Sequence, residues 1–214
     1  MAKARQQWIE TSEVFPMFPT LVWKIQLKAE ARNAILARID PALQRMRRDL
    51  PELASGKGWQ SGHRLHELDE CQDLVRYIHD TVKSVLQFLR IDSGAVEITG
   101  CWANILAVGA AHKSHSHPNN FLSGVYYVHT SPGAQSISFH DPRPQTAIIR
   151  PPVTALTAEN TDQVVVSVSD GALLIFPAYL QHSVDANMGE GERVSISFNV
   201  MFSRFTENFS KPLW

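Results

Sequence analysis

Two histidines that are separated by one residue are the first candidates for chemistry in this sequence. His115 and His117 stand in the run 112–117, which holds three of the nine histidines of the chain. In an extended segment, side chains at positions i and i+2 point to the same side, so both imidazoles can converge on one ion. Imidazole suits Fe, Zn, Cu or Ni, and a third ligand is needed to define a face of the coordination sphere. The pair therefore predicts a divalent metal site that a third side chain completes.

His182 is the best candidate for the third ligand. It follows the apolar run 171–176 and a turn that begins at Pro177. This layout resembles that of a ligand at the mouth of a β-barrel. The alternative interpretation is a solvated histidine pair in a loop, with His182 on the surface.

Arg193 and Ser195 follow His182 on the last long alternating segment. Their spacing places a guanidinium fork and a hydroxyl on one face of a strand, where together they can bind a carboxylate. The alternative is a rim arginine in a structural ion pair. The position of the pair behind a candidate metal ligand favours the carboxylate site.

The ordered combination of these motifs resembles a bacterial and phage family of 2-oxoglutarate- and Fe(II)-dependent oxygenases. The resemblance covers roughly residues 98–201 and rests on the runs 115–128, 137–143, 171–182 and 193–199. It implies a double-stranded β-helix fold that binds Fe(II). It also implies an enzyme that uses 2-oxoglutarate and O₂ as co-substrates to hydroxylate a further substrate. Carried over by position, it implies that His115 and His182 are metal ligands. It also implies that Arg193 and Ser195 bind the far carboxylate of 2-oxoglutarate.

His117 departs from the pattern of this family, which usually has Asp or Glu two residues after the first histidine. A neutral imidazole there removes one negative charge from the site and alters its redox tuning. Two other assignments stay open. In one, His117 is the first ligand and Asn119 takes the carboxylate position; in the other, Asp141 supplies a carboxylate, although Asp141-Pro142-Arg143 is typical of a turn. We expect His115, His117 and His182 to be the metal ligands.

Asn104 and Tyr127 are further candidates for binding the co-substrate. An amide or phenol that faces the barrel interior can hold the C1 end of 2-oxoglutarate. Since adjacent tyrosines point to opposite faces of a strand, at most one of Tyr126 and Tyr127 faces the metal.

Other residues near these motifs are expected to have no role in the site. Trp102 and Phe176 are expected in the barrel core, and His112 and His129 at the surface.

The elements that must position these residues follow from the hydrophobic periodicity. We expect a strand within 20–27, a helix over 28–50 that is kinked or split at Pro41, a loop over 51–70, and a helix over 71–90. After Gly94 the period becomes twofold, which predicts strands at 96–107, 121–130, 135–140, 163–169, 172–177 and 192–203.

Six short strands without helices between them favour an antiparallel barrel or jelly roll. The sequence therefore predicts a mainly β, α+β chain that forms a single domain over 1–214. Within it, a strand and helices in 1–95 support a double-stranded β-helix core over 96–203.

The composition is that of an ordinary soluble protein. Hydrophobic residues make up 44%, charged residues 19%, and the net charge is −1, which gives no reason to expect nucleic acid as a partner. No apolar run approaches membrane-spanning length and the N-terminus lacks a signal-like apolar stretch, so we expect no membrane partner and a cytoplasmic location. Cys71 and Cys101 are expected to be buried, reduced thiols. The expected partners are O₂ and a small-molecule or peptide substrate, with no signal for the oligomeric state.

Two other enzyme functions compete with the oxygenase. The runs that begin at Gly109 and Gly171 resemble the two motifs of a three-histidine cupin-type dioxygenase, but Phe121 and Leu122 stand where a glutamate is expected. A zinc hydrolase fits less well, because Asn119 replaces the aspartate of its H-x-H-x-D motif.

A binding function without catalysis is the remaining alternative. His117 supports it, since a degenerate metal site could serve only to bind a metal or a small ligand. Metal analysis separates this module from both oxygenases.

Overall fold

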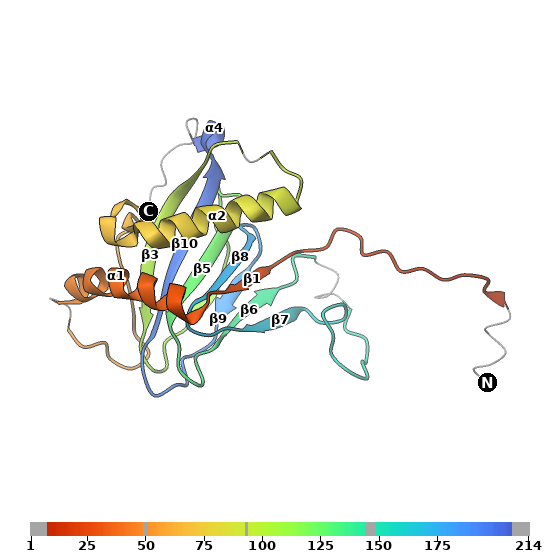
Figure 1. Ribbon diagram of the computed structural model, residues 1–214. Coiled ribbons are helices and arrows are strands. Elements are labelled where there is room, and N and C mark those ends of the chain that lie inside the picture. The colour runs from red at the N-terminus through yellow and green to blue at the C-terminus, as the bar shows by residue number, and fades with distance from the viewer. Residues whose placement is uncertain (1–7, 49–50, 93, 144–148, 207–214) are drawn as a thin grey trace.

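Two antiparallel sheets form the framework of the protein in a computed structural model that describes residues 8–48, 51–92, 94–143 and 149–206. The larger sheet has the strand order β1-β8-β5-β10-β3-β2 and the smaller one β4-β9-β6-β7 (Figure 1). The strands are β1 (Trp23–Gln26), β2 (Gly58–Gln60), β3 (Val96–Leu106), β4 (His112–His115), β5 (Leu122–His129), β6 (Ser136–His140), β7 (Gln163–Ser167), β8 (Ala172–Pro177), β9 (His182–Val184) and β10 (Arg193–Phe202).

A first apolar layer lies between the two sheets. Tyr127 and Phe176 from the larger sheet pack there with Ile137 and Phe139 from the smaller one. Two sheets that face each other across such a layer form the expected double-stranded β-helix.

A second apolar layer lies between the outer face of the larger sheet and two helices, α1 (Ala29–Arg47) and α2 (Gln72–Phe88) (Figure 1). Helix α2 buries a stripe that includes Leu74, Ile78 and Val82, at the spacing of a helix face. A last short helix, α4 (Ser203–Thr206), follows β10. None of the helices in the described part of the chain is long and apolar enough to cross a membrane.

The observed elements correct the sequence prediction in two places. The segment 51–70, expected as a loop, contains β2, which pairs with the end of β3, and a 3₁₀ turn at Leu65–Glu67. Of the two expectations for Pro41, a kink or a split, the split is wrong, since α1 runs through this proline as one helix. The six strands predicted after Gly94 are all present, with boundaries that differ by one or two residues.

Candidate metal centre

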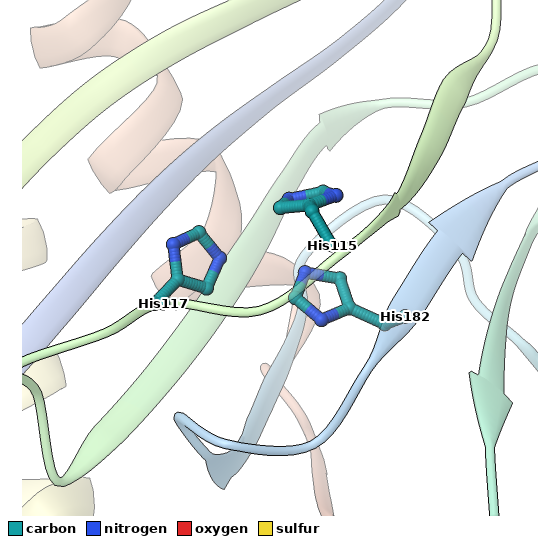
Figure 2. A group of neighbouring side chains, drawn as sticks. All are labelled: His115, His117 and His182. Atoms are coloured by element: carbon teal, nitrogen blue, oxygen red, sulfur yellow. The ribbon is translucent and has the colours of Figure 1, made fainter. Parts of the chain in front are cut away.

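Three histidines converge at one end of the space between the sheets. Each of His115, His117 and His182 offers a ring nitrogen, and these nitrogens lie within 4.8 Å of one another. Figure 2 shows the three rings grouped together, with His115 and His182 on strands and His117 on the segment that follows β4. The structure therefore brings together the three side chains that the sequence predicts as ligands.

Backbone pairing fixes the positions of these histidines. His115 ends β4 and stands directly opposite His182, the first residue of β9. His117 lies just beyond β4, where its backbone N–H donates to the carbonyl of Ala178 at 2.9 Å. The segment that carries His115 and His117 is thus held beside the segment that carries His182, although the two are distant in sequence.

Hydrogen bonds to carbonyl groups set the orientation of two of the rings. The Nδ1 atom of His115 lies 2.8 Å from the carbonyl oxygen of Lys113, and that of His182 lies 3.0 Å from the carbonyl oxygen of Leu180. Because a carbonyl oxygen only accepts, Nδ1 carries the proton in both rings. The Nε2 lone pairs then remain available for a metal, which is the usual arrangement of metal-binding histidines.

Burial keeps two of the rings in the neutral form that binds metals. It lowers the pKa of His182, which is 4% exposed, to about 4. It also lowers the pKa of His117 to about 3, an effect that the neighbouring His182 and His115 increase. Three neutral imidazoles are a suitable donor set for iron and for other divalent transition metals.

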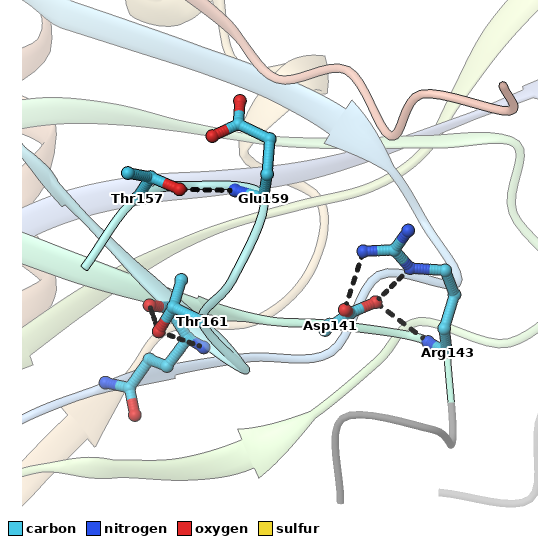
Figure 3. Close-up of polar contacts among 6 residues, drawn as sticks. Asp141, Arg143, Thr157, Glu159 and Thr161 are labelled. Carbon is cyan, nitrogen blue, oxygen red and sulfur yellow. Dashed lines mark hydrogen bonds and ion pairs between the residues drawn. The ribbon is translucent and has the colours of Figure 1, made fainter. Parts of the chain in front are cut away.

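The alternative oxygen ligands lie elsewhere. The carboxylate of Asp141 accepts hydrogen bonds from the backbone N–H of Arg143 at 3.0 Å and from its Nε at 2.9 Å (Figure 3). Figure 3 also shows that the backbone N–H of Glu159 donates to the hydroxyl of Thr157, and that Thr161 contacts the backbone of Gln163 at the start of β7. Asn119 has a left-handed backbone (φ 63°) and an exposed side chain. Asp141 therefore stabilises a turn, and neither residue lines the pocket beside the histidines.

A pocket that is partly open to solvent extends from the three histidines between the sheets. One transverse row of paired residues lines it: Gln60 on β2, Asn104 on β3, Ser195 on β10 and Tyr127 on β5 stand next to one another. Tyr126 instead faces the helices. The side chains that the sequence predicts for co-substrate binding therefore share one wall with the metal centre.

Arg193 is a buried cation in this wall. It is 3% exposed, and none of the ion pairs between described residues includes it. Its Nε has no hydrogen-bond partner, and its Cζ lies 5.1 Å from the ring centroid of Tyr127, whose hydroxyl also has no partner. Burial raises the pKa of Tyr127 to about 12, so the phenol keeps its proton. A buried guanidinium in this state requires an anion.

The amide of Asn104 is already occupied by protein groups. Its Oδ1 accepts from Nε2 of Gln60 at 2.8 Å, and its Nδ2 donates to Oγ of Ser197 at 2.9 Å. A role for Asn104 at the C1 end of 2-oxoglutarate stays a prediction.

Gln60 was missed as a pocket residue in the sequence analysis because its segment lacks sustained periodicity. Only the pairing of β2 with β3 reveals its position.

Two further residues lie closer to the site than the sequence suggests. Trp102, expected in the core, is buried but lines the pocket, and its ring centroid lies 5.9 Å from that of His117. His112, expected at the surface, is half-buried and lines the pocket, because the pairing of β4 with β9 shifts register between His112 and His115. Such a bulge can turn both side chains to one face. His129 is exposed and Phe176 is buried, as expected.

Residues 100–199 match the family described as "Putative 2OG-Fe(II) oxygenase". No curated protein sequence matches the chain.

Solved structures with the same fold include three proteins that are 12–14% identical to this chain. The Pseudomonas putida prolyl-4-hydroxylase aligns with a TM-score of 0.58 at 14% identity, over 86% of this chain and 93% of that one. A Trichoplax adhaerens prolyl hydroxylase, in complex with a hypoxia inducible factor oxygen degradation domain peptide fragment, gives 0.59 at 13% identity, over 89% and 87%. HygX from Streptomyces hygroscopicus, with nickel and 2-oxoglutarate bound, gives 0.58 at 12% identity, over 86% and 83%. These similarities confirm the double-stranded β-helix.

Proposed function

The chain belongs, over residues 100–199, to the 2-oxoglutarate- and Fe(II)-dependent oxygenases, and from this premise we propose that it works with a centre of three histidines. His115, His117 and His182 would hold Fe(II), and Arg193 and Ser195 would bind the far carboxylate of 2-oxoglutarate. The observation that carries this assignment is the convergence of three ring nitrogens within 4.8 Å in the pocket that also contains Arg193.

When bound, Fe(II) and 2-oxoglutarate would provide the electrons that reduce O₂, so that one of its oxygen atoms can be inserted into a C–H bond of the substrate. The side chains of the protein position these reactants. Carbonyl groups hold the Nδ1 atoms of His115 and His182, which would leave Nε2 of both rings free to bind the metal. Arg193 offers guanidinium donors beside the hydroxyls of Ser195 and Tyr127, which would fix one end of a dicarboxylate.

The walls of the pocket support the reaction by excluding water. Val125 and Ile137 line the pocket as buried apolar side chains, and the half-buried Val184 lines it as well. Electrostatic interactions inside such a site are stronger than in water, and side reactions with solvent are reduced.

We propose a small molecule or a peptide as the substrate. The Trichoplax enzyme holds a peptide fragment, and the pocket of the present chain is partly open to solvent. We also propose that residues 1–214 act as one domain, in which 1–95 supports the core over 96–203.

Anaerobic binding followed by exposure to O₂ tests the proposal. Purified protein should bind one Fe(II) and one 2-oxoglutarate, and with O₂ it should release succinate even without substrate, although slowly. A His182→Ala variant should lose Fe(II) binding, whereas an Arg193→Met variant should keep Fe(II) and lose 2-oxoglutarate. Binding of neither compound to the unaltered protein would contradict the proposal, and metal binding without succinate release would favour a non-catalytic module.

A further inference from the structure

The charged groups of the pocket are unbalanced. Arg193 and the histidines His112, His115, His117 and His182 line it, but no aspartate or glutamate is among the lining residues that the structure describes. Asp185, next to the lining residue Val184, is exposed and accepts a hydrogen bond from Oγ of Ser138 at 3.5 Å. Two other carboxylates that lie close in sequence to lining residues form ion pairs. Asp141 pairs with Arg143, and Glu192 pairs with Arg47 at 2.6 Å.

This imbalance persists when the proposed reactants are bound, and in this respect the inference rests on the proposed function. A divalent metal and the guanidinium of Arg193 bring three positive charges, whereas 2-oxoglutarate brings two negative ones. A carboxylate in place of His117 would make the site neutral. With three neutral imidazoles, one positive charge stays uncompensated in a pocket where its field is poorly screened.

An unpartnered donor lies in the same part of the pocket. Trp102 is 6% exposed, and its Nε1 has no hydrogen-bond partner among the residues that the structure describes. An indole N–H only donates, so the group can be satisfied only by an acceptor. The ring is held in place by stacking on His63, with centroids 4.6 Å apart, and lies next to His117.

The uncompensated positive charge at the metal centre and the unpartnered indole N–H of Trp102 both favour an anionic ligand. We propose that the substrate of this pocket is an acid, which places a carboxylate or phosphate group near Trp102 and His117. This anion balances the metal centre and accepts the hydrogen bond of the indole. A cationic substrate of the same shape is rejected, because it adds to a positive charge that is already in excess.

Three small molecules of nearly identical shape test this inference without turnover. Acetate, acetamide and acetamidinium differ in charge, and the broadening of their methyl proton signals reports binding near a paramagnetic ion. The protein is loaded with Mn(II) and saturated with 2-oxoglutarate in the absence of O₂. We expect the broadening for acetate to exceed that for acetamide by about tenfold, as one uncompensated charge at close range predicts. Acetamidinium should show no more broadening than acetamide.

Variants locate the bound anion. His117→Asp should reduce the broadening for acetate to that for acetamide, because it adds the missing negative charge. Trp102→Phe keeps an aromatic ring against His63 but removes the donor, and should reduce acetate broadening by several fold. Gln87→Glu is the matched control, since it adds one negative charge on the exposed face of α2 and should change nothing.

The possible failures are distinguishable. If the protein binds neither Mn(II) nor 2-oxoglutarate, the proposed function itself is contradicted. If it binds both but treats acetate and acetamide alike, the oxygenase proposal stands and the acidic substrate is ruled out. If acetate broadens only before 2-oxoglutarate is added and loses the broadening at saturation, then acetate occupied the co-substrate position, and the inference is equally overturned.

Discussion

Arg193 holds its guanidinium carbon 5.1 Å from the ring centroid of Tyr127, and each of these buried side chains keeps a polar atom without a partner. Both residues come from neighbouring strands of the larger sheet, β10 and β5. The guanidinium of Arg193 and the hydroxyl of Tyr127 can therefore bind an anion, which neither of the two strands supplies.

Replacement of Arg193 by Met should weaken 2-oxoglutarate binding by about 30-fold or more, since truncation of one partner of a buried charge pair costs about 2–5 kcal/mol. Isothermal titration calorimetry under nitrogen, with Mn(II) bound, measures this change. Arg64→Met is the control, because Arg64 is exposed and pairs only with Glu67 at the surface. An Arg193→Met variant with unchanged affinity would favour the cupin-type dioxygenase.

Replacement of His117 by Ala should weaken Fe(II) binding by more than about 100-fold, because loss of an outer-sphere partner alone costs about 10- to 100-fold. His117→Asp should retain binding, since a carboxylate is also a suitable iron ligand. Anaerobic equilibrium dialysis measures both affinities, with the exposed His129→Ala as control. If His117→Ala binds iron as tightly as the unaltered protein, His117 is not a ligand.

Replacement of Gly124 by Ala should destabilise the fold. A Cβ at this position would lie 2.2 Å from Cζ of Phe198 and 2.6 Å from the carbonyl oxygen of Leu174. Overpacking of this kind costs about 1–3 kcal/mol, which urea unfolding can measure. Gly62→Ala is the matched control, since a Cβ there meets nothing within 4 Å. Equal stability of the two variants would contradict the packing of β5 against β10.

Cys71 and Cys101 should resist alkylation in the native protein. Burial raises the pKa of Cys71 to about 11 and that of Cys101 to about 12, above the ordinary value of 9.0. At pH 8 a thiol reagent should therefore label neither residue until urea is added, when both should react. Rapid labelling of the native protein would show that one thiol is accessible.

The same pKa values predict how stability changes at alkaline pH. Because the folded protein holds both thiol protons more tightly than the unfolded chain, their contribution to stability is complete below pH 9. It is lost as the pH rises from 9 toward 11–12. A Cys71→Ala/Cys101→Ala variant should lose less stability over this range in urea unfolding than the unaltered protein. An equal loss in both would contradict the prediction.

The long strands could be predicted from the sequence because their alternating apolar residues record burial directly. β4 and β9 could not be predicted, because they are short and have little apolar alternation. Two of the four residues that pair between them are the histidines His115 and His182. Their conformation comes from pairing with each other and not from local preference. The pocket-facing positions of His112 and Trp102 likewise depend on a bulge and on a stacking partner from another segment.

The short strand β2 has a consequence for how this enzyme class can diversify. It extends the larger sheet and brings Gln60 to the pocket from a segment outside β4 and β9, which carry His115 and His182. Substitutions in this segment can change which molecules are admitted while the iron centre stays intact. Gln60 is thus a position at which selectivity can evolve or be engineered without replacing any of the three histidines.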